Sequence, residues 1–272
     1  MSLRRTQVIR TLVCLLLLSG FTQNAQATGT DPGIKLTNGH WPPYMEKTPP
    51  HYGVISQIVT LAFARKGIPV SYGFFPWSRA KRLAEKGLWD GSVAWTCRPE
   101  LLENFHFSDP IVAHHYVLFH QTETDFDWKT VDDLKPYRIG LTQDYNYGNE
   151  FEKAVADDEI RTEMTTSDAS NFRKLAAGRI DLFPMEPAVG MAMLKNLGLS
   201  DKITFNKTPL QSDYLYLILS RAVPANERYL QAFNAGLQEL RESGQLKTLI
   251  TRSLPDIPLS YLVESDQESP CL

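Results

Sequence analysis

Aromatic and guanidinium side chains gather in one stretch of the sequence, residues 75–110 (FPWSRAKRLAEKGLWDGSVAWTCRPELLENFHFSDP). Trp77 and Arg79 fall at the start of a predicted helix, and Trp95 and Arg98 fall at or just after the end of the next predicted strand. Aromatic rings bind cations and flat groups, and guanidinium groups bind carboxylates through paired hydrogen bonds. The stretch therefore predicts one wall of a pocket for a small polar or anionic, possibly aromatic, molecule.

Three other segments supply further candidate ligand residues. Tyr44 follows two prolines, which hold it on a stiff loop after a predicted strand. Tyr145 and Tyr147 lie in a polar loop, and Glu186 begins a predicted helix. A structural role explains several of these residues equally well, because large aromatic residues often belong to the core and a carboxylate is favourable at a helix start.

The sequence offers little for metal, cofactor or nucleic-acid chemistry. His114 and His115 are neighbours on a predicted strand, so they point to opposite faces and cannot share an ion. The chain has no phosphate-binding glycine loop and no Gly-x-Ser-x-Gly motif. A basic tract is also missing, which argues against nucleic acid as a partner. We expect no metal, no cofactor and no catalytic residue.

The first 27 residues have the pattern of a secretory signal peptide. Three arginines precede an apolar run at 12–18, and Ala25-Gln26-Ala27 follows, which predicts cleavage after Ala27. The run is shorter than the roughly 20 residues that span a bilayer. We therefore expect a periplasmic protein. Cleavage removes three of the 28 basic residues and leaves 25 against 31 acidic ones, so the net charge of the mature chain is about −6.

Two cysteines, Cys97 and Cys271, remain after this cleavage. An oxidising compartment would join them if they met, but the sequence leaves their separation open. A Cys97–Cys271 disulfide and two free thiols are equally compatible with the sequence.

Periodicity predicts an α/β protein with two strand and helix series. Strands are expected at 34–37, 69–75 and 90–95 with helices at 53–66 and 78–86 between them, as in a parallel sheet covered by helices. A long strand at 111–121 and a polar crossing segment at 122–129 lead to the second series. That series closes with a short strand at 203–205.

A separate buried strand at 213–220 and two helices return the chain to the first series. The expected divisions are a signal peptide at 1–27, a first lobe at 28–121 and 213–254, a second lobe at 122–212 that includes the hinge crossings, and a tail at 255–272. Two crossings between lobes predict a hinge that closes on a ligand.

Several motifs occur in an order and spacing that resemble a known family. They are Trp41-Pro42-Pro43-Tyr44, Gly87-Leu88-Trp89-Asp90, Arg98-Pro99-Glu100, Phe107-Ser108-Asp109-Pro110 and Gly178-Arg179-Ile180-Asp181. With them the chain resembles the extracytoplasmic solute-binding proteins of family 3, which serve polar amino acid ABC importers. The resemblance implies a two-lobed fold of the type II periplasmic binding proteins, with one lobe inserted in the other and a ligand cleft between them. It also implies a small-molecule ligand and a membrane ABC permease as partners, and we expect a monomer.

The chain departs from this family at residues that meet the ligand. Members that bind amino acids carry an arginine where this chain has Leu101, and that arginine grips the α-carboxylate. Glu186 matches the acidic residue that meets the α-amino group, and the loop at 144–148 replaces the usual Gly-Thr pair. The resemblance therefore implies a ligand other than a simple α-amino acid, whose carboxylate Arg79 or Arg98 would meet from another direction.

Two alternative functions share this fold. One is a ligand-sensing subunit that docks to a signalling receptor. The other is an enzyme, since a few relatives are dehydratases that bind a cyclic acid in the same cleft. Glu186 is the acid–base group that the sequence places there, and we expect binding without turnover.

Overall fold

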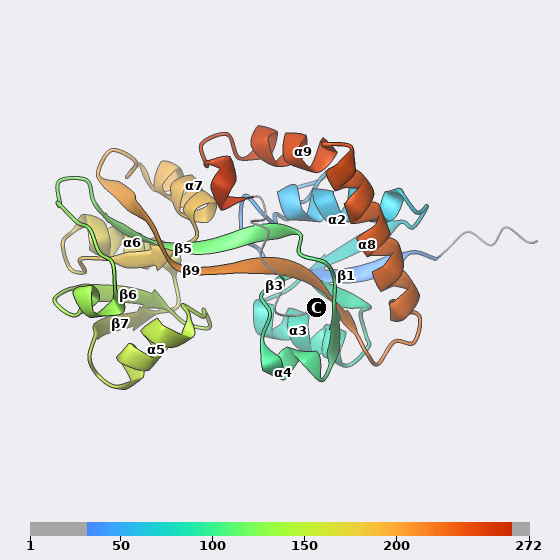
Figure 1. Cartoon of the computed structure of the whole chain (residues 1–272), viewed down its shortest axis with the longest axis horizontal. Helices are drawn as coiled ribbons and strands as arrows, with labels where there is room; N and C mark the ends of the chain where they lie inside the picture. The colour runs from blue at the N-terminus through green and yellow to red at the C-terminus, as the bar shows by residue number, and fades with distance from the viewer. Residues whose placement is uncertain (1–31, 263–272) are drawn as a thin grey trace, which may run out of the picture. The chain divides into compact units, whose positions relative to one another are not determined.

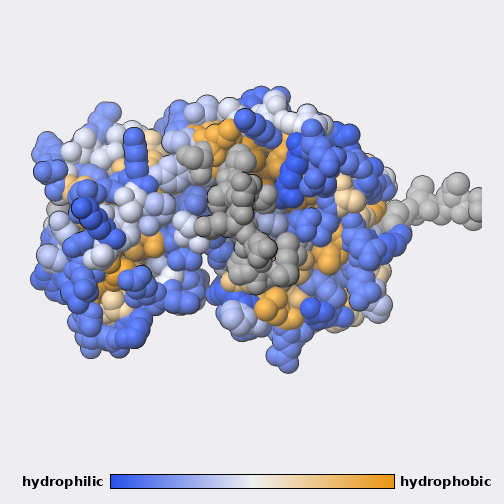
Figure 2. Space-filling view, viewed as in Figure 1, coloured by the Kyte–Doolittle hydropathy of each residue, from blue (hydrophilic) through white to orange (hydrophobic). Residues whose placement is uncertain are grey.

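The computed structural model describes residues 32–262 (Figure 1). The predicted signal peptide, Cys271 and the last part of the predicted tail lie outside these residues. Within them, no helix is both long and apolar enough to cross a membrane. Polar residues cover most of the face drawn in Figure 2, with smaller hydrophobic areas between them.

The first strand and helix series forms the expected parallel sheet. Strands β1 (Ile34–Asn38), β2 (Val70–Phe74) and β3 (Gly91–Trp95) lie in the order β2-β1-β3, and both pairings are parallel. Helices α2 (Val54–Ala64) and α3 (Trp77–Glu85) connect them. Val93 packs in the core cluster that contains α2, whereas Trp95 packs in the cluster that contains Ala84 of α3. The pairing of β3 with β9 shifts register between Val93 and Trp95, so these two side chains contact different clusters, and helices α2 and α3 pack in separate clusters.

Two long antiparallel strands carry the chain between the two series (Figure 1). Strand β5 (Val112–Gln121) pairs along its whole length with β9 (Ile203–Ser220), which also pairs with β3. The short strands β4 (Phe105–Phe107) and β8 (Phe183–Met185) pair with β9 and β5, respectively.

The prediction of two separate strands at 203–205 and 213–220 is wrong, because both belong to the continuous strand β9. The residues between them are polar and include Pro209, which hid the strand in the sequence pattern. Pro209 lies opposite Val117, where the register of β5 and β9 shifts. A strand tolerates proline at such an irregularity.

The second series contains a two-stranded parallel sheet, β6 (Arg138–Thr142) and β7 (Arg161–Thr165). Around it lie the short helix η1 (Val131–Leu134) and helices α5 (Asn149–Ala156), α6 (Asp168–Ala176) and α7 (Pro187–Leu197). The segment at 122–129 was expected to be a crossing outside the core, and this is wrong. Phe126 and Trp128 are buried in one cluster with Phe151, so the crossing is made by β5 and β9 instead.

The remaining elements complete the core of the described region. They are α4 (Pro99–Leu102), α8 (Asn226–Glu242), α9 (Gln245–Ser253) and η2 (Leu259–Tyr261). One continuous hydrophobic cluster contains Phe63 and Phe233 from the first series, and Phe172 and Phe183 from the second. All described residues therefore belong to one compact unit. The lobe boundaries at 122 and 213 stay predictions.

Candidate functional site

A hydrogen bond between Tyr44 and Glu186 joins the two series. The Tyr44 hydroxyl donates to Glu186 Oε1 over 2.9 Å, and both side chains are buried, with 1% and 2% of their surface exposed. These residues are 142 positions apart in the sequence. The structure thus brings together two predicted ligand residues that no local pattern connects.

The loop that carries Tyr44 is fixed to the start of helix α2. The carbonyl of Tyr44 accepts a hydrogen bond of 3.0 Å from the first-turn amide of Ile55. Gly53 makes this approach possible, because its φ is +90° and a Cβ atom there would lie 2.5 Å from the Tyr44 carbonyl oxygen. Glycine adopts this backbone conformation without the steric penalty of other residues.

Glu186 caps the N-terminus of α7 and is held there as a buried acid. Its Oε2 accepts a hydrogen bond of 2.7 Å from the Val189 amide. Burial raises the pKa of Glu186 to about 7, although the hydrogen bonds from the helix amides and from Tyr44 oppose the rise. Near neutral pH this carboxyl can therefore accept or release a proton.

A row of contacting rings extends from Tyr44 across β5 into the second series. We call Trp41, Tyr44, His114, Tyr116, Tyr145 and Tyr147 the aromatic row. Within it, the Trp41 ring lies 5.1 Å from Tyr44 and 5.7 Å from His114. The His114 ring lies 4.8 Å from Tyr116.

Tyr116 in turn contacts Tyr147 at 5.0 Å and Tyr145 at 6.0 Å. These centroid distances are typical of favourable aromatic pairs. The aromatic row therefore runs without interruption from the loop after β1 to the loop after β6.

A second carboxylate, Asp168, lies at the far end of the aromatic row. Its Oδ2 accepts from the Tyr145 hydroxyl over 2.9 Å, and its Oδ1 accepts from Thr142 Oγ1 over 2.7 Å. Ser167, rather than Asp168, caps helix α6, so the Asp168 carboxylate is available to these hydroxyls. Burial raises the pKa of Asp168.

Tyr116 lies at the centre of the charges. Burial raises the pKa of its hydroxyl, and the charges of Asp168 and Glu186 raise it further, whereas Arg98 lowers it. Arg98 also lowers the pKa of Asp213, which burial raises. Asp213 lies opposite His114 in the pairing of β5 with β9. The charges of groups from both series therefore act on one tyrosine hydroxyl.

Three nitrogen atoms at this site are buried without a hydrogen-bond partner among the described residues. They are Trp41 Nε1, His114 Nδ1 and Arg98 Nε. Burial lowers the pKa of His114 to about 3, so its ring is neutral. Since an unpaired buried polar atom costs free energy, these nitrogens mark places where a ligand can supply hydrogen bonds.

The two predicted tryptophans lie against each other, and Arg79 lies apart from the aromatic row. The rings of Trp77 and Trp95 meet edge to face at 5.6 Å. A bulge at Ala94, whose φ is +64°, ends the regular pairing of β3 and places Trp95 Nε1 2.7 Å from Ser92 Oγ. Arg79 is exposed, and its guanidinium carbon lies 5.3 Å from the centre of the Phe75 ring.

Arg98 contacts Glu100 at 3.7 Å and is partly exposed. Its neighbour Cys97 forms a disulfide. Because Cys271 lies outside the described residues, the Cys97–Cys271 pairing stays a prediction.

Five residues of this site were not among the predicted ligand residues, namely Trp41, His114, Tyr116, Asp168 and Asp213. His114 and Tyr116 are two positions apart on β5 and therefore point to the same face, which the spacing alone could have indicated. Asp168 belongs to none of the motifs described above, and Asp213 is predicted only as the first residue of a buried strand. The environments of His114, which is buried, and His115, which contacts Ser212, confirm that these neighbours face opposite sides.

No group of three metal-ligating side chains occurs within residues 32–262.

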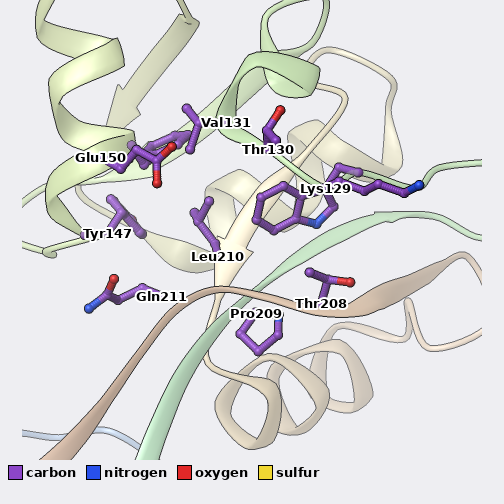
Figure 3. Close-up of a pocket in the computed structure, with 12 residues that line it drawn as sticks. Lys129, Thr130, Val131, Tyr147, Glu150, Thr208, Pro209, Leu210 and Gln211 are labelled. Atoms are coloured by element: carbon purple, nitrogen blue, oxygen red, sulfur yellow. The ribbon is translucent and has the colours of Figure 1, made fainter.

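A pocket of about 380 Å³ lies beside the aromatic row in the second series. Its walls come from the segment before η1, the start of α5 and the middle of β9 (Figure 3). Tyr147 lines it together with Trp128, Leu210 and Gln211. Of the eight predicted ligand residues, Tyr147 is the one that the pocket and the aromatic row share.

Comparisons with known proteins agree with the predicted family. The model of the bacterial extracellular solute-binding proteins, family 3, matches residues 35–255. The probable amino-acid-binding protein YxeM of Bacillus subtilis (strain 168) is 25% identical over 151 residues, which are 55% of each chain. The chain thus matches about half the length of this relative.

Solved structures resemble the chain over most of its length. A histidine kinase sensor domain with similarity to periplasmic binding proteins has a TM-score of 0.69 at 16% identity, over 87% of this chain and 99% of its own. An ancestral arginine-binding protein bound to arginine has a TM-score of 0.67 at 17% identity, over 82% and 98%. A mutant of ArgBP from T. maritima has a TM-score of 0.66 at 19% identity, over 82% and 96%. These likenesses confirm the predicted α/β fold of the type II periplasmic binding proteins.

Proposed function

Because the chain belongs to the bacterial extracellular solute-binding proteins of family 3, we propose that it captures a small polar metabolite in the periplasm and delivers it to a membrane ABC importer. The predicted signal peptide supports export, and the family supports a small-molecule ligand. A monomer that binds and releases its ligand without turnover is the simplest form of this function.

The observation that carries the proposal is the contact between Tyr44 and Glu186. One residue comes from each series, and the 2.9 Å hydrogen bond between them lies at one end of the aromatic row. A ligand that enters here would exchange this bond for its own contacts to both series. It would favour the closed form by its differential affinity for that form.

We assign the ligand contacts to residues of both series. Tyr44, Trp77, Trp95 and Arg98 are the proposed contacts from the first series. Tyr145, Tyr147 and Glu186 are the proposed contacts from the second. Arg79, which lies exposed beside Phe75, would reach a ligand only after a change of its side-chain conformation.

Calorimetric titration and thermal shift against a broad panel of metabolites test the proposal. A ligand at 100 times its Kd should stabilise the protein by about 2.7 kcal/mol, which corresponds to a rise in Tm of roughly 5–10 °C for a chain of this size. Glu186→Gln should weaken binding, whereas the exposed Glu123→Gln should not. Silence across amino acids, amines, organic acids and sugars would refute the binding function.

The likeness to a histidine kinase sensor domain supports a second candidate, a ligand-sensing subunit. Deletion of the gene separates the two. Loss of solute uptake would support the importer, and loss of a transcriptional response with uptake intact would support the sensor. Mass spectrometry of the bound ligand after incubation tests the enzymatic alternative, since a binding protein returns its ligand unchanged.

A further inference from the structure

We propose that the ligand of this site carries a net positive charge and is an amine held against the aromatic row between the carboxyl groups of Glu186 and Asp168. The inference rests on the proposed binding function and names the charge class of its ligand. It differs from the anionic ligand that the arginines of the sequence suggested.

The first argument is that the carboxylates of the site have only neutral hydrogen-bond donors. Glu186 accepts from a tyrosine hydroxyl and a backbone amide. Asp168 accepts from the hydroxyls of Tyr145 and Thr142, and Asp213 Oδ1 accepts from the Tyr214 amide. None of the three acids forms an ion pair within residues 32–262. Without a cation nearby, a buried carboxyl group keeps its proton to a higher pH, and an ammonium group would supply the opposite charge that stabilises the ionised form.

The second argument concerns the positive charges. Arg98 is the cation that acts on Tyr116 and Asp213, and it already lies 3.7 Å from Glu100. Its side chain is 30% exposed, so part of its charge is solvated. The neutral ring of His114 adds no positive charge. The acids therefore outnumber the cations around the aromatic row.

The third argument is the aromatic row itself, which ends at an acid on both sides. Tyr44 donates to Glu186 at one end, and Tyr145 donates to Asp168 at the other. Ring faces attract cations, most strongly where water is excluded. An ammonium group bound at either acid would therefore lie beside a tyrosine ring.

The unpartnered nitrogens add one detail about the ligand. Trp41 Nε1 and Arg98 Nε are donors, so they fit a ligand that also presents an oxygen acceptor. His114 Nδ1 can accept from an ammonium group if the ring proton resides on Nε2. The ligand class is thus a cationic amine with a carbonyl or hydroxyl oxygen.

Matched probes with the same five-carbon chain test the sign of the charge. Cadaverine carries two amines, 5-aminovalerate carries one amine and one carboxylate, and glutarate carries two carboxylates. Lysinamide adds a cation with a carbonyl acceptor. We expect titration calorimetry to give lysinamide or cadaverine an affinity about tenfold or more above 5-aminovalerate, and no heat with glutarate.

Variants connect the result to the carboxylates. Glu186→Gln and Asp168→Asn should each weaken lysinamide binding about tenfold, and the exposed Glu123→Gln should leave it unchanged. Far-ultraviolet circular dichroism and thermal melts establish that each variant is folded.

The outcomes separate the inference from the function on which it rests. Tighter binding of glutarate or 5-aminovalerate would overturn the inference and leave the binding function intact. The same conclusion would follow if the metabolite panel yields an anionic or neutral ligand and none of the four probes binds. A different cationic ligand from that panel would support the inference, and the absence of any ligand would refute both.

Discussion

Replacing Glu186 by glutamine should change how the stability of the protein depends on pH. The folded carboxyl keeps its proton up to about pH 7, because it is buried, whereas the unfolded carboxyl releases it near the ordinary value of 4.5. The stabilisation that this group contributes is therefore fully present below pH 4.5 and is lost as the pH rises through about 7. A glutamine side chain does not titrate, so the variant should lack this loss.

The size of the effect follows from the two pKa values. The interval between 4.5 and about 7, at about 1.4 kcal/mol for each pKa unit, corresponds to about 3 kcal/mol. No reduction for solvent screening applies to a side chain with 2% of its surface exposed. For a chain of this length, about 3 kcal/mol corresponds to a change in Tm of roughly 6–12 °C.

Urea denaturation of the wild type and the variant at pH 4.5, 6 and 8 measures the difference in unfolding free energy. The unfolding free energy of Glu186→Gln, relative to that of the wild type, should rise by about 3 kcal/mol between the lowest and highest pH. Other titrating groups are common to both proteins and cancel. The glutamine amide can accept a hydrogen bond from the Val189 amide and donate one to the Tyr44 oxygen. Any change that it makes to the unfolding free energy is independent of pH, because the amide does not titrate.

Two further variants make this test specific. Tyr44→Phe removes a hydrogen bond that lowers the pKa of Glu186, so the loss of stability should extend to higher pH. Glu123→Gln alters an exposed carboxylate and should give a difference that is constant with pH. A constant difference for Glu186→Gln as well would refute a buried acid at this position.

The remaining predictions concern the charge of the site and the packing of the fold. Arg98→Gln should strengthen cadaverine binding by roughly 1 kcal/mol, the order of one charge–charge interaction at about 4 Å in water, because Arg98 is partly exposed, and weaker binding in calorimetry would contradict a cationic ligand. Gly236→Ala should lower the free energy of unfolding by about 1–3 kcal/mol, because the added Cβ would lie 2.0 Å from the Ala62 carbonyl oxygen where α8 crosses α2. Urea denaturation checks the second prediction, and the exposed Ala222→Gly serves as a change of similar size elsewhere.

The sequence by itself determined the elements that depend on near neighbours. Hydrophobic periodicity and turn residues indicated β1, α2, β2, α3 and β3 to within a residue or two at most boundaries. These patterns report which face of a single strand or helix is buried, and both the residues and their neighbours lie within one element. The family resemblance likewise predicted Tyr44 and Glu186 as ligand residues.

Only the tertiary structure decided which side chains meet. No pattern linked Tyr44 to Glu186 or Tyr145 to Asp168, because these contacts depend on the arrangement of whole elements. The continuity of β9 was hidden for the same reason, since its polar middle is a strand only because β5 pairs with it.

The arginines show this limit most clearly. Arg79 and Arg98 have similar sequence settings, because Arg79 lies two residues after Trp77, Arg98 directly follows Cys97, and both lie near a predicted element boundary. The fold leaves Arg79 exposed beside Phe75 and places Arg98 where its charge lowers the pKa values of Tyr116 and Asp213. The sequence determined that charged and aromatic groups are present. The distances between these groups depend on how β5 and β9 join the two series. The charge of the ligand that we propose depends on these distances.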